Sequence, residues 1–402
     1  MNNIIILEDN LMQELIKNVM DEVVLWRRDL HQIPEINNDL PKTSAYVAKQ
    51  LDKMGISYTK GVGIEHAIVA EIQGTKEGQG KTIALRADMD ALPVIEETGL
   101  QFAAKNGNMH ACGHDAHTAS LLGTAKVLNQ IKDQFSGKIV LLFQPGEEVS
   151  AGAEPMVKAG CLDGVDGIIG IHVGNIASDG VPGTAYFKFG SMMACLDKWN
   201  MTIKGVGSHG AYPHESHDPV MMQAHIITAV QEIISRELNP VDPGVVTVGI
   251  VKGGSAYNVI PGSVYLEGTA RAVNQKTREY ISKRIGEIAE SIAKAFRGTI
   301  DYNYIFGAPP VVNDSEFTKN VIESAKKAIG EENVQIMDNP VMGGEDFAYY
   351  LEKVPGTFIF ISTQLAIEGT CYPHHNSRFA IDEQYLDRSI KIFVQSALDL
   401  LG

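Results

Sequence analysis

Residues 108–117, NMHACGHDAH, place three histidines, a cysteine and an aspartate within ten positions. Imidazole, thiolate and carboxylate groups together suit Zn²⁺, Mn²⁺, Ni²⁺ or Co²⁺. Cys112 and His114 are two residues apart, so both side chains of an extended turn can point at one centre. A closed structural zinc site usually has two such local pairs, whereas this sequence has only one. The pattern therefore favours an open, catalytic metal site with its other ligands in distant segments.

Further acids and histidines lie at the ends of predicted strands. In an open α/β sheet, ligands bind outside the carboxyl ends of the strands. Taken singly, each residue has an ordinary alternative, such as a solvated acid pair, a turn-shaping aspartate or a hydrogen-bonded histidine. Together with the 108–117 cluster they come from five segments, which favours one shared site. The residues that follow or end these strands are Asp88, Asp90, Glu147, Glu148, His172, His374 and His375.

The adjacent Glu147 and Glu148 can have two different roles in metal-dependent hydrolysis. One carboxylate binds metal, and the other takes a proton from metal-bound water and returns it to a leaving amine. The alternative, a Cys112 nucleophile with a histidine base, leaves both glutamates without a role.

The elements that must position these residues follow from the apolar patterns. Apolar residues about four apart predict a helix over 10–32, and alternating strands and helices then predict a mostly parallel sheet with helices on both faces. From about residue 198 the order becomes β-α-β-β-α-β, the ferredoxin-like pattern. We therefore expect an α/β catalytic domain formed by residues 1–186 and 306–402, with an inserted α+β domain at 187–305.

Charge and composition exclude several partners. The 34 basic and 49 acidic residues give a net charge of −15, without a basic block, which argues against nucleic acid or an anionic membrane as partner. No signal peptide and no membrane-spanning segment is predicted. Four cysteines are too few for a disulfide framework, so we expect a cytoplasmic protein. Three of them are interpreted as packing thiols: Cys161, Cys195 and Cys371.

Ten motifs in order along nearly the whole chain resemble the aminoacylase-like, metal-dependent amidohydrolases, which include hippurate hydrolases, N-acyl-L-amino acid amidohydrolases and indole-3-acetyl-amino acid hydrolases. HACGHDAH and QPGEE are the most specific together. The motifs are RRDLHQIPE, LRADMDALP, MHACGHDAH, FQPGEE, GIHVG, GVGSHGAYPHESHDP, NVIPG, GTAR, MGGEDFAYY and HHNSRF. The family's GGHAA-like segment is GSHGA here, which changes the residues around the histidine but not the histidine itself.

The resemblance implies a role for each matching residue. Cys112 would bridge two divalent metals, Mn²⁺ or Zn²⁺ in the first place and Ni²⁺ or Co²⁺ as alternatives. His114 and His172 would complete one metal; Glu148 and His375 would complete the other, with His374 as the fallback for His375. The remaining roles are Glu147 as general base, Asp90 as the acid that orients a ligand, His209 as the group that polarises the scissile carbonyl, and Asn258 and Arg271 as holders of the substrate carboxylate.

The expected reaction is hydrolysis of the amide bond of N-acyl amino acids through a metal-bridging water activated by Glu147. The resemblance also implies that the inserted domain is a lid that forms a homodimer or homotetramer. One alternative keeps the two-metal mechanism but takes small peptides, as a dipeptidase or carboxypeptidase does. The other is a non-catalytic metal-binding protein, against which the presence of Glu147 and Asp90 argues.

Overall fold

The computed structural model describes residues 2–175 and 180–401, with the side chains of the first helix from Met12 onward. The chain divides into two compact units. The first consists of Met1–Gly190, Asn313–Asp338 and Tyr349–Gly402, and the second of Ser191–Val312 and Asn339–Ala348. Whether the predicted boundaries at 187 and 305 delimit folding domains stays a prediction.

A mixed eight-stranded sheet forms the centre of the first unit. Its four middle strands, β4, β3, β5 and β16, are neighbours and run parallel. They are almost completely buried, which explains why they appear in the sequence as continuous apolar runs. In spatial order the strands are β1 (Ser57–Lys60), β2 (Ile68–Gln73), β4 (Lys138–Gln144), β3 (Thr82–Asp88), β5 (Gly167–Gly174), β16 (Gly356–Ser362), β6 (Ala185–Phe187) and β15 (Val334–Ile336).

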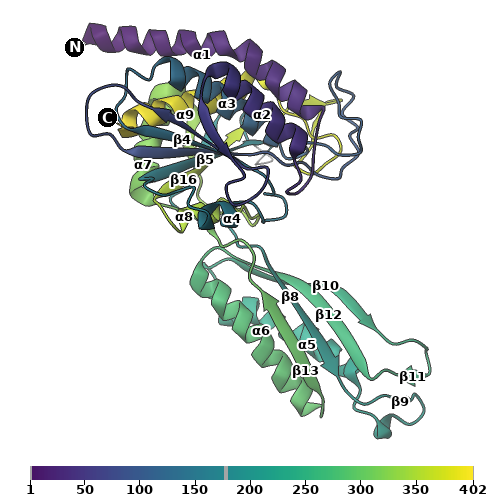
Figure 1. Cartoon of the computed structure of the whole chain (residues 1–402). Coiled ribbons are helices and arrows are strands. Elements are labelled where there is room, and N and C mark those ends of the chain that lie inside the picture. Colours follow the sequence, from purple (N-terminus) through teal and green to yellow (C-terminus); the bar gives the residue numbers. More distant parts are fainter. Residues whose placement is uncertain (1, 176–179, 402) are drawn as a thin grey trace. The chain divides into compact units, whose positions relative to one another are not determined.

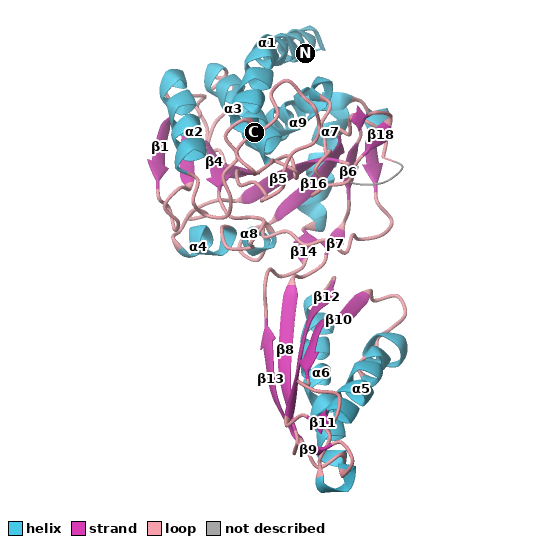
Figure 2. Ribbon diagram, turned by 90° about the vertical axis from the view of Figure 1, so that its right-hand side faces the viewer, coloured by secondary structure: helices cyan, strands magenta, loops and turns pink. Residues whose placement is uncertain are grey.

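Helices cover both faces of this sheet, as the sequence predicts (Figures 1 and 2). Helices α1, α2, α3 and α9 lie on one face and the short α4 on the other. Helix α3 packs against α1 and α9 as well as the sheet, so nearly all its side chains are buried. The bounds are α1 (Asn2–His31), α2 (Pro41–Met54), α3 (His114–Gln130), α4 (Ala153–Lys158), α7 (Ser315–Ile329), α8 (Ala348–Leu351) and α9 (Leu386–Leu401).

The second unit is built on an antiparallel four-stranded sheet in the order β10-β12-β8-β13. The chain order β8-α5-β10-β12-α6-β13 is the predicted ferredoxin-like pattern. Helix α5 ends at Ala229, and a π-helical turn follows at Ile233–Glu237. The bounds are β8 (Asp197–Lys204), α5 (Pro219–Ala229), β10 (Gly244–Gly253), β12 (Ser263–Ala272), α6 (Gln275–Ala295) and β13 (Thr299–Ile305).

Short elements complete the described chain. Strands β9 and β11 pair with each other, and so do β17 and β18. The short strands are β7 (Gly190–Met193), β9 (Ser208–His209), β11 (Val259–Ile260), β14 (Val311–Asn313), β17 (Ala366–Ile367) and β18 (Thr370–Cys371), and the 3₁₀ turns are η1 (Pro213–Glu215), η3 (Glu331–Asn333) and η4 (Glu383–Tyr385).

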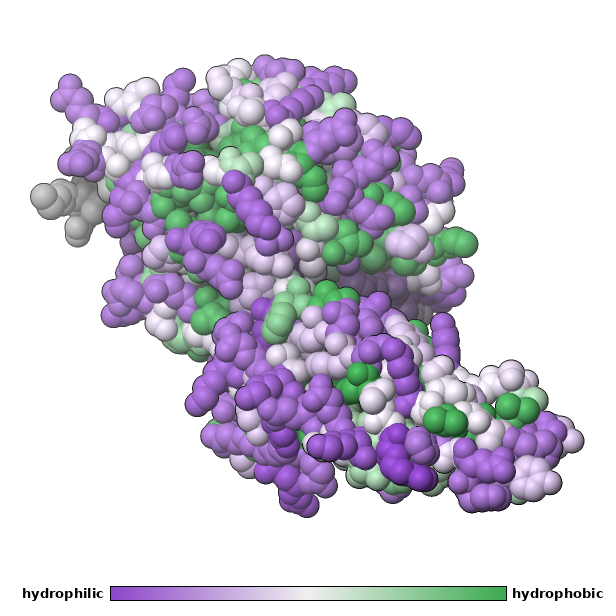
Figure 3. All heavy atoms as spheres, turned by 60° about the horizontal axis from the view of Figure 1, so that its bottom comes forward, coloured by the Kyte–Doolittle hydropathy of each residue, from purple (hydrophilic) through white to green (hydrophobic). Residues whose placement is uncertain are grey.

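The surface visible in Figure 3 is mostly hydrophilic, with small hydrophobic patches. This agrees with a chain in which 21% of the residues are charged. Within residues 2–175 and 180–401, every helix is too short or too polar to cross a lipid bilayer.

Candidate metal centre

The parallel strands bring the predicted ligands together at one edge of the sheet. Because β4, β3, β5 and β16 run parallel, their carboxyl ends all reach the same edge. Asp88 ends β3, Glu147 follows β4, and His172 lies near the end of β5. The turn before α3 contributes Cys112, and His114 is the first residue of α3. The predicted residues that form this cluster are Asp90, Cys112, His114, Glu147, Glu148, His172 and His375.

Cys112, His114 and His172 form the first group of potential ligands. Their ligand atoms all lie within 4.8 Å of one another, and Cys112 Sγ is 3.4 Å from His172 Nε2. His172 Nδ1 lies 3.1 Å from the carbonyl oxygen of Val173, which leaves Nε2 directed at the thiol. Gly113 has a φ of 87°, and this left-handed turn lets its two neighbours reach the same centre.

Cys112 also belongs to a second group, with Glu148 and His375, whose ligand atoms again lie within 4.8 Å of one another. His375 Nε2 is 3.3 Å from Glu148 Oε2. One thiol is thus shared by two neighbouring sets of donors. This is the arrangement that a bridging ligand between two ions requires.

The backbone around residue 375 distinguishes the two neighbouring histidines. His375 adopts a φ of 65°, and its N–H donates to Ala111 O at 2.8 Å. His374 instead lies 3.3 Å from Val173 O through Nε2, with its ring packed on Phe379. Gly174 makes room for it, because a Cβ there would be 2.1 Å from His374 Nε2. His375 therefore faces Glu148, and His374 is held away from it.

Asp90 fixes the segment that carries both glutamates. Its Oδ1 accepts the backbone N–H of Glu147 at 3.1 Å, and its Oδ2 accepts that of Glu148 at 3.0 Å. Its Oδ1 also lies 3.3 Å from His114 Nδ1. One buried carboxylate thus ties the Glu147–Glu148 segment to a predicted ligand, which fits the orienting role expected for Asp90.

The electrostatics of the cluster favour a bound cation. Burial by itself lowers the pKa of His114, but the carboxylates of Asp88, Asp90 and Glu148 raise it to about 10. Burial raises the pKa of Glu148, an effect that His114 opposes. A positive charge among these three carboxylates is therefore stabilised, whether a bound metal ion or a proton on His114 carries it.

Unpartnered buried atoms provide the test of whether a metal fits. His114 Nε2 and Glu148 Oε1 are buried, and no hydrogen bond of suitable geometry reaches either atom from the described chain. Buried polar atoms normally have a partner, so such a concentration requires an explanation. Thiol, imidazole and carboxylate donors form a set that binds Zn²⁺ or Mn²⁺. The residues present fit a dinuclear metal centre.

The predicted catalytic and substrate-binding residues of the second unit lie at two separate positions. His209 pairs with Val259 across β9 and β11, and Gly210 N–H donates to Asn258 O at 2.7 Å, so His209 and Asn258 are neighbours. They adjoin the Ser263 end of β12, whereas Arg271 lies at its other end. Eight residues of extended strand at about 3.3 Å each separate the two ends by roughly 26 Å. The structure does not bring Asn258 and Arg271 together.

Behind the cluster lies a charged group whose contacts the sequence did not predict. Asp115, next to His114, lies 2.8 Å from both Arg27 Nε and His31 Nδ1 of α1. His31 Nε2 is 3.2 Å from Glu96. The signal in the sequence is the RRDLH motif, whose Arg27 and His31 are four residues apart and so lie on one face of the helix. Both side chains are buried. This group anchors the first turn of α3 to α1.

One prediction about the cysteines is wrong. Cys161 and Cys195 are buried, as expected of packing thiols, but Cys371 is exposed. It lies in the β17–β18 hairpin, whose strand residues are mostly exposed, so the side chain has no core to enter.

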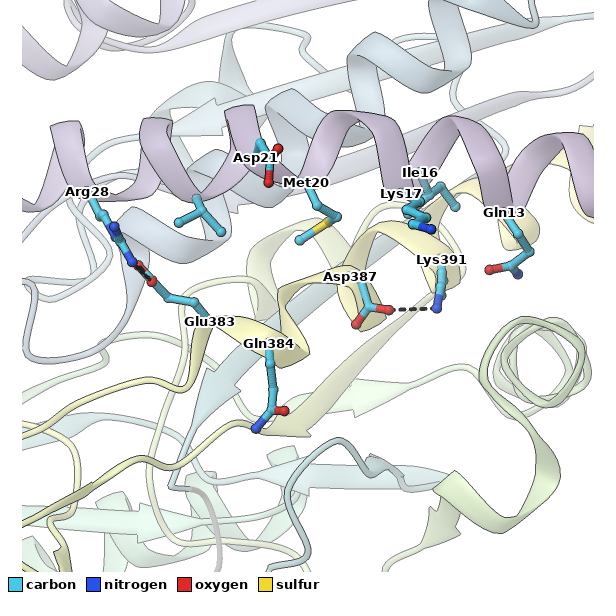
Figure 4. Close-up of a pocket in the computed structure, with 11 residues that line it drawn as sticks. Gln13, Ile16, Lys17, Met20, Asp21, Arg28, Glu383, Gln384, Asp387 and Lys391 are labelled. Atoms are coloured by element: carbon cyan, nitrogen blue, oxygen red, sulfur yellow. Dashed lines mark hydrogen bonds and ion pairs between the residues drawn. The ribbon is translucent and has the colours of Figure 1, made fainter.

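A groove of about 580 Å³ lies between α1 and the segment from η4 into α9 (Figure 4). Its charged residues are largely paired, with Arg28 facing Glu383 and Lys391 facing Asp387. None of the predicted ligands or catalytic residues lines it. The chemistry therefore belongs to the strand ends and not to this groove.

Comparison with known proteins agrees with this centre. The model of peptidase family M20/M25/M40 matches residues 84–399. An N-acetyl-L-cysteine deacetylase of Bacillus subtilis (strain 168) is 39% identical over 402 residues, covering 100% of this chain and 93% of that protein. Thermostable carboxypeptidase 1 of Saccharolobus solfataricus is 38% identical over 381 residues, covering 93% and 95%. The crystal structure of Bacillus subtilis YXEP, a dinuclear metal-binding peptidase of the M20 family, aligns with a TM-score of 0.82 at 33% identity, covering 96% and 99%.

The mostly parallel sheet and the donor set at its strand ends define a metal-dependent hydrolase. The chain belongs to peptidase family M20/M25/M40, and within it is an amidohydrolase. The family membership predicted from the motifs is confirmed.

Proposed function

We propose that this chain hydrolyses the amide bond of N-acyl amino acids, releasing a carboxylic acid and a free amino acid. The observation that carries the proposal is the shared position of Cys112 between two donor groups, beside a glutamate pair fixed by Asp90. The similarity to an N-acetyl-L-cysteine deacetylase supports the acyl amino acid as substrate.

The proposed ligands are Cys112, His114 and His172 for one divalent ion and Cys112, Glu148 and His375 for the other. Mn²⁺ or Zn²⁺ is the first choice, with Ni²⁺ or Co²⁺ as alternatives, because this donor set accepts all four. When bound, such ions polarise the scissile carbonyl and lower the pKa of water toward ~7.

Glu147 is the proposed general base. It takes a proton from the attacking water as the C–O bond forms, and gives that proton to the amine nitrogen as the C–N bond breaks. Asp90 holds Glu147 for this transfer through the backbone N–H of residue 147. His209 is proposed to polarise the scissile carbonyl, and Asn258 and Arg271 to hold the substrate carboxylate.

We further propose that His209 and the neighbouring Asn258 act on one substrate together with Arg271 of another copy of the chain. They lie at opposite ends of the β8–β12 ladder, and a small N-acyl amino acid is much shorter than the roughly 26 Å between them. This supports the homodimer or homotetramer expected through the inserted domain, 187–305. A cytoplasmic location remains part of the proposal.

A substrate panel tests the proposed function. Metal-stripped enzyme is reloaded with one ion at a time and assayed on N-acetyl and N-benzoyl amino acids, hippurate included, and on dipeptides. We expect the highest kcat/KM on the N-acyl amino acids. Preference for dipeptides would replace the proposal by the carboxypeptidase or dipeptidase alternative, which the similarity to thermostable carboxypeptidase 1 favours. Absence of hydrolysis with every ion would contradict both.

A further inference from the structure

His117 lies one helical turn after His114 and has both ring nitrogens occupied. Nδ1 lies 2.6 Å from Asp88 Oδ1, and Nε2 accepts the backbone N–H of Val173 at 2.8 Å. A backbone N–H can only donate, so Nε2 must be the unprotonated nitrogen. Nδ1 therefore carries the proton and donates it to Asp88, which fixes a single tautomer.

This tautomer excludes His117 as a metal ligand. The ligand atoms of Asp88, His114 and His117 lie within 4.8 Å of one another, so spacing alone would allow a metal there. The lone pair of His117 Nε2 is used by Val173, however, and Asp88 Oδ2 already receives Arg86 Nη1 at 2.7 Å. The contacts leave His117 a different role.

The contacts of His117 join three elements that carry the proposed ligands. The β3–β5 ladder ends at the Arg86–Gly170 pair, three residues before Val173. Beyond that pair, the hydrogen bonds of His117 to Asp88 and Val173 link β3, α3 and β5. The ring also packs against both proposed ligand histidines, with centroid distances of 5.4 Å to His114 and 4.7 Å to His172.

We infer that His117 is a positioning residue that sets the separation of His114 and His172 for the ion they share. The inference rests on the proposed metal centre. It adds that His117 affects the binding of one of the two ions and not of the other. The other donor group contains Glu148 and His375 besides Cys112. Within the described chain, the hydrogen bonds of the His117 ring go to Asp88 and Val173 and not to these two residues. Loss of His117 therefore weakens binding of the His114–His172 ion more than binding of the other ion.

Two conservative variants separate the two contacts. In His117→Asn the amide lies near the position of Nδ1 and can still donate to Asp88, but it does not reach Val173. In His117→Gln the amide lies near the position of Nε2 and can still accept from Val173. Ser120→Ala is the matched control, because Ser120 is buried on the same helix and its hydroxyl has no partner in the described chain.

The experiment titrates metal-stripped full-length protein with Co²⁺, followed by calorimetry and by the visible spectrum. We expect two ions per wild-type chain. In His117→Asn one ion binds about 10–100-fold more weakly, the range for lost outer contacts of a metal site, and the other is unchanged. His117→Gln recovers part of this affinity, and Ser120→Ala binds as wild type does.

Equal weakening of both ions in His117→Asn, or wild-type affinity for both, would overturn the inference alone. A wild-type chain that binds no Co²⁺ would overturn the proposed metal centre together with it. A measurement without any substitution guards against misfolded variants. In ¹⁵N-histidine NMR of the metal-free wild type, we expect the Nδ1–H tautomer for His117, and an Nε2–H signal would refute the positioning contact.

Discussion

Asp90→Asn tests the arrangement of the centre most directly, because one buried carboxylate serves two backbone donors. Asp90 Oδ1 and Oδ2 accept the N–H groups of Glu147 and Glu148 at 3.1 and 3.0 Å. Asparagine keeps one oxygen and turns the other acceptor into an NH₂ donor, which faces one of these N–H groups. A hydrogen bond to a charged group contributes about 1.5–3 kcal/mol, and this is the expected loss in unfolding free energy of the metal-free protein.

Thermal unfolding of the metal-free variant measures this loss. For a unit of this size, 1 kcal/mol corresponds to roughly 2 °C, so we expect the midpoint to fall by about 3–6 °C. Turnover of the reloaded enzyme should fall about 10–100-fold, because the Glu147–Glu148 segment is no longer fixed. The exposed Asp133, changed to Asn, is the control for the loss of one charge. An Asp90→Asn protein with wild-type midpoint and turnover would refute the reasoning.

Three further predictions concern the reaction and the assembly. Glu147→Gln should keep near-normal metal content and lose at least ~10²-fold in kcat, and retained activity would remove Glu147 as the base. Cys112→Ala should bind less metal per chain by elemental analysis, since both donor groups use this thiol; an unchanged stoichiometry of two would contradict the bridging role. A mixture of inactive His209→Ala and Glu147→Gln chains should regain about a quarter of wild-type activity, because half of the dimers are mixed and each holds one complete site. A mixture that stays inactive would show that His209 acts within its own chain.

The motif match already preferred His375 to His374, and the tertiary structure adds the physical reason. His374 and His375 are equivalent in a strand-end argument, and the φ of 65° at His375 and the contact of His374 with Val173 separate them. The exposure of Cys371 likewise depends on a hairpin that no periodicity indicates. Side-chain direction in irregular segments is set by the neighbouring packing, which lies outside the local sequence.

The sequence by itself predicted the α/β architecture and the donor groups that end its strands. Apolar runs and their spacing are local properties, so they predict the parallel strands and place Asp88, Glu147 and His172 at one edge. Only the tertiary structure decided how the cluster is held. The double acceptance by Asp90, the fixed tautomer of His117 and the separation of His209 from Arg271 each depend on contacts between segments far apart in the chain. Distances of this kind follow from packing and strand register, which a residue pattern does not contain.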